Sequence, residues 1–113
     1  MILRKKYRYI LAEASASVNY EVKALDAEMR KSLLPLMGIK SFAQANPHVV
    51  KTLSHNSFII KTARGSEHAI ILALAFIKEM HDSEIGIYTL RTSGTIRSIL
   101  RYHAKAFQNE GAS

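Results

Sequence analysis

The segment from residue 84 to residue 107, EIGIYTLRTSGTIRSILRYHAKAF, constrains the fold most strongly. Its first half alternates apolar and other side chains with the period of a half-buried strand, and its second half carries apolar residues at helical spacing. The triplet Ser93-Gly94-Thr95 separates the two halves, and the hydroxyl of Ser93 is suited to cap a helix. The chain is therefore predicted to end with a strand over Glu84–Thr92 and a helix over Thr95–Phe107.

The rest of the chain contains five further stretches with a clear period. We predict strands over 5–14, His48–Leu53 and Phe58–Thr62 and helices over Asn19–Leu34 and Glu67–Met80. The turn Ser54–Ser57 makes the middle two strands a hairpin, Pro35 and Gly38 are expected to end the first helix, and residues 39–47 are expected to form a loop.

This order of elements, β-α-β-β-α-β-α, indicates one α+β domain with a ferredoxin-like fold. Four antiparallel strands would carry two helices on one face, with an additional C-terminal helix that is free to cover the other face. The RNA-recognition motif shares this topology. Residues 1–108 are predicted to form the domain and residues 109–113 a flexible tail.

Basic residues form two clusters without intervening acids, and the formal net charge is +7. One cluster lies in the first strand and the other in the last strand and helix, a distribution that favours a nucleic-acid surface over a merely solubilising charge. The free N–H groups at the start of the last helix can also attract an anion, although a plain helix cap is the simpler interpretation. The residues expected to contact RNA are Arg4, Lys5, Lys6, Arg8, Arg91, Ser93, Gly94, Thr95, Arg97, Arg101 and Lys105.

The predicted helix Glu67–Met80 has an apolar surface wider than one buried stripe requires. In a chain of 113 residues, burial of the whole circumference is difficult, so a second protein is expected to cover part of this helix. The candidate partner residues are Ile71, Leu72 and Phe76.

The sequence offers little for catalysis by this chain alone. It has no cysteine, and its five histidines are scattered singly, so no metal site and no cofactor are expected. No nucleophile–base arrangement, glycine-rich phosphate loop or carboxylate pair is recognisable, and no catalytic residue is assigned. No signal peptide or membrane span is recognisable either, so a soluble intracellular protein without membrane contact is expected.

Three segments together resemble ribonuclease P protein component 2, the archaeal and eukaryotic Pop-five family. The basic-aromatic strand over residues 5–10 resembles that family's first strand, and Ile59-Ile60-Lys61 followed by Arg64 resembles its third. The run Thr92-Ser93-Gly94-Thr95-Ile96-Arg97 after a strand is the most specific of the three.

The resemblance implies a non-catalytic subunit of the ribonucleoprotein that removes the 5′ leader from precursor tRNA. It implies ribonuclease P RNA as a partner, with Mg²⁺ used by that RNA, and a TIM-barrel-like protein subunit in a two-plus-two heterotetramer. It further implies a cytoplasmic location if the chain is archaeal and a nuclear or nucleolar one if it is eukaryotic. A ferredoxin-like domain that binds a small ligand or mediates oligomerisation stays open as the alternative. A small hydrolase of acylphosphatase-like topology is disfavoured, because no arginine follows the first strand in residues 14–18.

Overall fold

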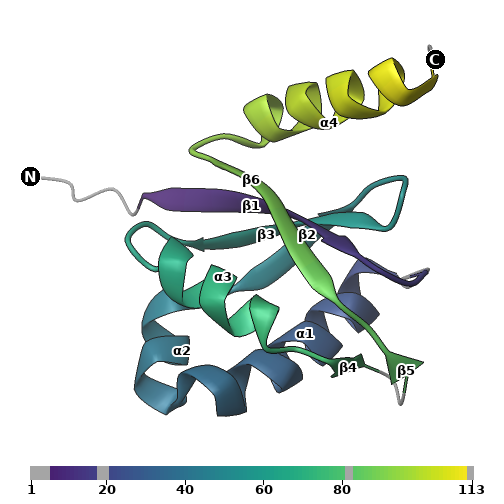
Figure 1. Cartoon of the computed structure of the whole chain (residues 1–113). Coiled ribbons are helices and arrows are strands. Elements are labelled where there is room, and N and C mark those ends of the chain that lie inside the picture. The colour runs from purple at the N-terminus through teal and green to yellow at the C-terminus, as the bar shows by residue number, and fades with distance from the viewer. Residues whose placement is uncertain (1–5, 18–20, 81–82, 112–113) are drawn as a thin grey trace, which may run out of the picture.

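A computed structural model describes residues 6–17, 21–80 and 83–111 of the chain. Within these residues, four strands form an antiparallel sheet in the order β2-β3-β1-β6. The strands are β1 (Tyr7–Ala14), β2 (His48–Thr52), β3 (Ser57–Ala63) and β6 (Ile87–Ser93). The two central strands are β1 and β3, so β3 separates β1 from β2 as in the split βαβ arrangement. The predicted α+β, ferredoxin-like fold is confirmed (Figure 1).

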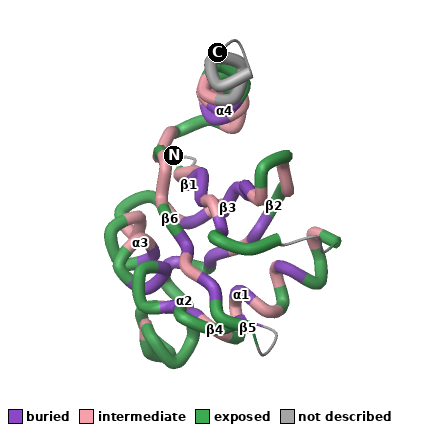
Figure 2. Tube along the Cα trace, turned by 45° about the vertical axis from the view of Figure 1, so that its right-hand side comes forward, coloured by how far each residue is buried: buried purple, intermediate pink, exposed green. Residues whose placement is uncertain are grey.

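Helices lie on both sides of this sheet. One side carries α1 (Val22–Met37), α2 (Ile39–Ala45) and α3 (Glu67–Ala75), and the opposite side carries α4 (Ile96–Gly111) (Figures 1 and 2). A short ribbon of β4 (Glu79–Met80) and β5 (Ser83–Glu84) lies between α3 and β6 in the chain. No helix in the described part of the chain is long and apolar enough to cross a membrane.

The alternation of side chains along β1 supplies both sides of the sheet. Ile10 and Ala12 are fully buried in the main core, which they share with α1 and α3. Leu11 points the other way, as the period of two in a strand requires, and packs with Ile59 of β3 and Ile99 of α4. All three residues of this second cluster are fully buried, so α4 is docked on the sheet by apolar contact.

The turn between β2 and β3 gives α4 a second attachment. His55 and Asn56 both have positive φ, at 61° and 58°, which is the geometry of the type I′ turn that tight hairpins favour. The hairpin prediction is therefore confirmed. Nε2 of His103, on α4, lies 3.2 Å from the carbonyl oxygen of Ser54 in this turn, and His103 is buried. His103 thus fixes α4 against the hairpin.

Several predicted boundaries in the first half of the chain were wrong. The helix α1 continues through Pro35 to Met37, because a proline in the last turn removes only one backbone donor. It ends at Gly38, whose φ is 84° and whose N–H donates to the carbonyl of Leu34 at 2.9 Å. The expected loop over residues 39–47 contains α2, whose C-terminal carbonyl at Ala45 accepts a hydrogen bond from the Thr62 hydroxyl at 2.9 Å. The expected start of the first helix at Asn19 lies outside the described residues.

The second half differs from the prediction by more than one residue at three boundaries. The helix α3 ends at Ala75, because the N–H groups of Phe76 and Ile77 bond three residues back and tighten the last turn, after which the chain enters β4. The last strand begins at Ile87 rather than at Glu84, which pairs within the ribbon instead. The last helix, α4, continues to Gly111, past the predicted end at Phe107, so the first residues of the expected tail are helical.

Candidate functional site

The turn that joins β6 to α4 sets where the basic helix begins. The hydroxyl of Thr95 accepts a hydrogen bond from the N–H of Ser98 at 3.2 Å, which is the contact of a helix cap. The hydroxyl of Ser93 instead accepts one from the N–H of Thr95 at 3.3 Å. The prediction that Ser93 caps the helix was therefore wrong: Thr95 caps it, and Ser93 stabilises the preceding turn.

Replacing Thr95 with alanine is expected to destabilise the protein by about 1 kcal/mol, the usual cost of removing a threonine cap. Urea unfolding measures this loss, and hydrogen exchange of the α4 amides shows whether it is concentrated in that helix. The variant Thr95→Ser retains a hydroxyl and should behave like the wild type. A full loss in Ser93→Ala with none in Thr95→Ala would assign the cap to Ser93 after all.

The first of two basic depressions runs along α4 and is called here the α4 groove. It has a volume of about 310 Å³, and its lining combines β6 with the exposed side of α4. The guanidinium carbon of Arg91 lies 4.8 Å from the ring centroid of Tyr102, a cation–π contact that fixes both side chains. The lining residues are Arg91, Ser98, Arg101, Tyr102 and Lys105.

The second basic depression, called the Gly94 recess, gathers residues from three distant segments. Its volume is about 340 Å³, and its lining residues are Lys6, Tyr7, Arg8, Arg64 and Gly94. The antiparallel register explains this assembly, because Tyr7 at the start of β1 pairs with Ala63 at the end of β3, and Tyr9 pairs with Ser93. A Cβ atom on Gly94 would lie 3.5 Å from Nη1 of Arg8, which places the guanidinium of Arg8 beside the turn between β6 and α4.

The two depressions contain six of the predicted RNA-contacting residues, and the others lie outside them. Lys6, Arg8 and Gly94 line the Gly94 recess, and three basic residues line the α4 groove. Arg97 is exposed on α4 but lines neither depression, and Ser93 and Thr95 shape the turn between β6 and α4. Arg4 and Lys5 lie outside the described residues.

Arg64 is a site residue that the residue-level prediction did not include. It is exposed, and its N–H donates to the carbonyl of Lys6 at 3.0 Å, which continues the ladder between β3 and β1. The sequence could have indicated Arg64 by its position directly after β3. In an antiparallel pair, a residue at the end of β3 lies beside the start of β1, which is basic.

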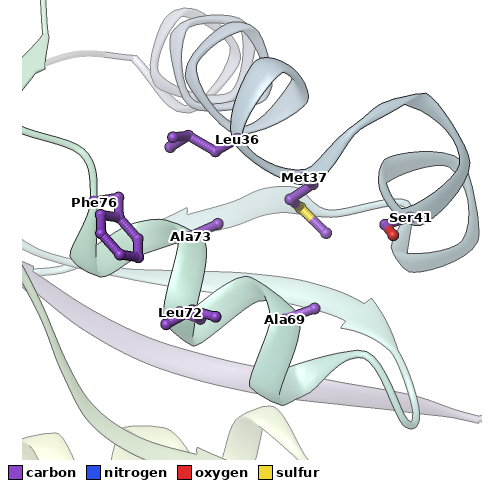
Figure 3. Close-up of a pocket in the computed structure, with 7 residues that line it drawn as sticks. All are labelled: Leu36, Met37, Ser41, Ala69, Leu72, Ala73 and Phe76. Carbon is purple, nitrogen blue, oxygen red and sulfur yellow. The ribbon is translucent and has the colours of Figure 1, made fainter.

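An apolar groove lies on the opposite side of the sheet from α4, where α1 and α2 meet α3. Its volume is about 220 Å³, and Figure 3 shows Leu36 and Met37 of α1 facing α3 across it. Leu72 and Phe76 remain 63% and 59% exposed, as the partner prediction requires. Ile71 does not belong to this surface, because it is half-buried against the main core. The groove is lined by Leu36, Met37, Ser41, Ala69, Leu72, Ala73 and Phe76.

The charged residues that line the two depressions are all basic. No acidic residue lines the α4 groove or the Gly94 recess in the described part of the chain. Among the same residues, no three histidine or carboxylate side chains come together as a group that could hold a metal ion. The two depressions therefore offer guanidinium and ammonium donors, which suit the oxygens of phosphate groups.

Comparison with known proteins connects this geometry to a family. The model of the Rpp14/Pop5 family matches residues 8–104. Three similar curated proteins are named "Ribonuclease P protein component 2". The one from Sulfurisphaera tokodaii is 28% identical over 83% of this chain and 76% of its own length. The one from Methanocorpusculum labreanum is 32% identical over 86% of this chain and 65% of its own length. The one from Methanosphaerula palustris is 30% identical over 88% of this chain and 62% of its own length.

The chain therefore spans less than two thirds of the last two relatives. A solved structure shares the fold: a chain in the cryo-EM structure of yeast ribonuclease MRP aligns with a TM-score of 0.59 at 8% identity. That alignment covers 99% of this chain and 98% of the other.

Proposed function

The chain belongs to the Rpp14/Pop5 family, and from this membership we propose that it is a non-catalytic protein subunit of ribonuclease P. In this role it binds and stabilises the RNA that removes the 5′ leader from precursor tRNA. The names of the three curated relatives support the assignment.

The observation that carries the RNA-binding role is the pair of basic depressions without acidic lining. The Gly94 recess includes Gly94 of the turn between β6 and α4, the α4 groove takes its lining from β6 and α4 themselves, and together the two present six basic side chains. Surface charge selected only for solubility usually mixes both signs, whereas phosphate binding calls for one sign. The six are Lys6, Arg8, Arg64, Arg91, Arg101 and Lys105. Arg97 extends this surface along α4, and Ser93, Gly94 and Thr95 position it.

The apolar groove is the proposed contact for the partner protein, a TIM-barrel-like subunit of the same particle in a two-plus-two heterotetramer. Four apolar side chains at or beside the groove are exposed by 46% to 80%, a concentration that marks a protein-interaction site. Because α4 lies on the other side of the sheet, RNA on α4 and a protein in the groove can be bound together (Figure 1). The four residues are Leu36, Ile39, Leu72 and Phe76.

Magnesium chemistry is assigned to the RNA subunit and to no residue of this chain. What the chain supplies is positive charge held on a rigid sheet and helix, which lowers the repulsion between RNA segments as they fold together.

Reconstitution tests the proposed function. The chain, the partner subunit and ribonuclease P RNA are combined, and cleavage of precursor tRNA is followed over a range of Mg²⁺ concentrations. Adding the chain with its partner should raise the cleavage rate and lower the Mg²⁺ requirement. An unchanged rate and an unchanged Mg²⁺ requirement would contradict the proposal.

A further inference from the structure

The α4 groove contains a stacked pair of planar side chains, Arg91 and Tyr102. Arg91 lies on β6 directly opposite Leu11 of β1, so both side chains face the side of the sheet that carries α4. Tyr102 of α4 packs on the same side, against the second cluster of buried residues that contains Leu11 and Ile99. The guanidinium carbon of Arg91 lies over the Tyr102 ring, 4.8 Å from its centroid. A planar cation from the sheet is therefore stacked on a ring from the helix.

The two members of this pair differ in their exposure to solvent. Tyr102 is half-buried, because the second cluster packs against it and Arg91 covers one face of its ring. Arg91 is exposed, and it belongs to β6, which forms one edge of the sheet in the described part of the chain. One face of the guanidinium therefore rests on the ring, and the other face is accessible from the groove.

An accessible guanidinium plane is a stacking surface for an unpaired base. The guanidinium is flat and delocalised, and the bases of single-stranded RNA stack on such planes as well as on aromatic rings. A base placed on Arg91 would extend the stack to three layers. Beside the stack, donors on one face of α4 follow each other at helical spacing and suit the phosphates that flank this base. These donors are Ser98, Arg101 and Lys105.

We propose that the α4 groove binds single-stranded RNA by stacking one unpaired base on Arg91, with Tyr102 as the support beneath it. The inference rests on the proposed RNA-binding role and narrows it to unpaired RNA, because a base inside a double helix is already stacked between its neighbours. Among the described residues that line the groove, none carries an amide or carboxylate that would read the edge of a base. Binding at this site therefore depends only weakly on sequence.

Fluorescence anisotropy with the full chain tests this assignment. The probes are a short labelled RNA strand and the same strand annealed to its complement, each titrated at several salt concentrations. Arg91→Lys retains the charge but removes the plane, so it should weaken binding of the single strand by about tenfold, the effect of losing one stacked base. Binding of the duplex should change by less than about twofold, and the salt dependence should stay that of the wild type, because the number of charges is unchanged.

Substitutions of Tyr102 test the support beneath the guanidinium. Tyr102→Leu retains an apolar side chain against the second cluster but removes the ring, so it should lower single-strand affinity more than duplex affinity. Tyr102→Phe retains the ring and should bind both RNA forms like the wild type. The control is Arg30→Lys, which changes an arginine at the same distance, 4.8 Å, from the ring centroid of Phe42 in α2, on the opposite side of the sheet. It should leave both affinities unchanged.

Three results would overturn the stacking site while the RNA-binding role stands. They are wild-type binding of the single strand by Arg91→Lys, equal weakening of both RNA forms by that substitution, and an equal loss in Arg30→Lys. If the wild-type chain binds neither RNA, the proposed RNA-binding role fails and the stacking site fails with it.

Discussion

Replacing Arg91, Arg101 and Lys105 together with alanine is expected to weaken RNA binding on the order of 100-fold at about 0.1 M salt. These residues supply all the positive charge that lines the α4 groove. Each phosphate contact releases a counterion and contributes about 0.7 to 0.9 to the slope of log K against log salt concentration. The loss of three contacts should therefore reduce the magnitude of the slope by about 2 to 3. As the salt concentration approaches 1 M, the RNA affinity of the triple variant should approach that of the wild type.

Titration of ribonuclease P RNA at several salt concentrations measures both quantities. The matched control removes three exposed lysines from α1 and α2 by Lys23→Ala, Lys31→Ala and Lys40→Ala, which changes the net charge by the same amount. This variant should retain most of the affinity and of the slope. Equal losses in both triple variants would mean that only net charge attracts RNA and that the α4 groove has no special role. Urea unfolding of both variants excludes a loss of fold, which matters because Arg91 contacts the Tyr102 ring.

The substitution Leu72→Asp is expected to weaken the complex with the partner protein subunit by at least about 100-fold. Burying an unpaired carboxylate in an apolar contact costs several kcal/mol, and about 1.4 kcal/mol corresponds to a factor of ten in affinity. The fold of the free chain should be unaffected, because Leu72 is 63% exposed and already in contact with water. Phe76→Asp, at a side chain that is 59% exposed in the same groove, should have a similar effect.

Titration calorimetry with the purified partner subunit gives the affinity, and circular dichroism confirms the fold. Tyr88→Asp is the matched control, because Tyr88 is 58% exposed but lies on β6, away from the apolar groove. It should bind the partner like the wild type. Wild-type affinity in both Leu72→Asp and Phe76→Asp would show that the partner docks elsewhere on the chain.

The four strands of the sheet and its longer helices could be predicted because the sequence patterns of such elements are local and periodic. The strand over residues 5–14 is predicted from the sequence, and the structure buries Ile10, Leu11 and Ala12 on its two faces. The helix α2 could not be predicted in the same way. Its seven residues, IKSFAQA, are too few to show a helical period, and the helix is stabilised by contacts such as that of Thr62 with Ala45.

Individual residues of the candidate site could be predicted from the sequence, but their assembly into one recess could not. Lys6, Arg8 and Gly94 were identified as separate candidates from charge and turn chemistry, but sequence spacing does not bring them together. The recess that they share depends on the pairing of β1 with β3 and β6, which also adds Arg64. Ile71 was misassigned because α3 is apolar on nearly all sides, so its pattern does not distinguish the residue facing the core from its exposed neighbour Leu72.

Cross-linking RNA to this chain inside the reconstituted ribonucleoprotein, followed by mass spectrometry of the attached peptides, tests most directly whether RNA occupies the two basic depressions. Cross-links are expected on the peptides that contain Lys6 and Arg8, Arg64, and residues 91–105. Peptides from the solvent-exposed side of α1 should carry few or none. Cross-links concentrated on α1 or on the apolar groove, with none on residues 91–105, would contradict the proposed RNA surface.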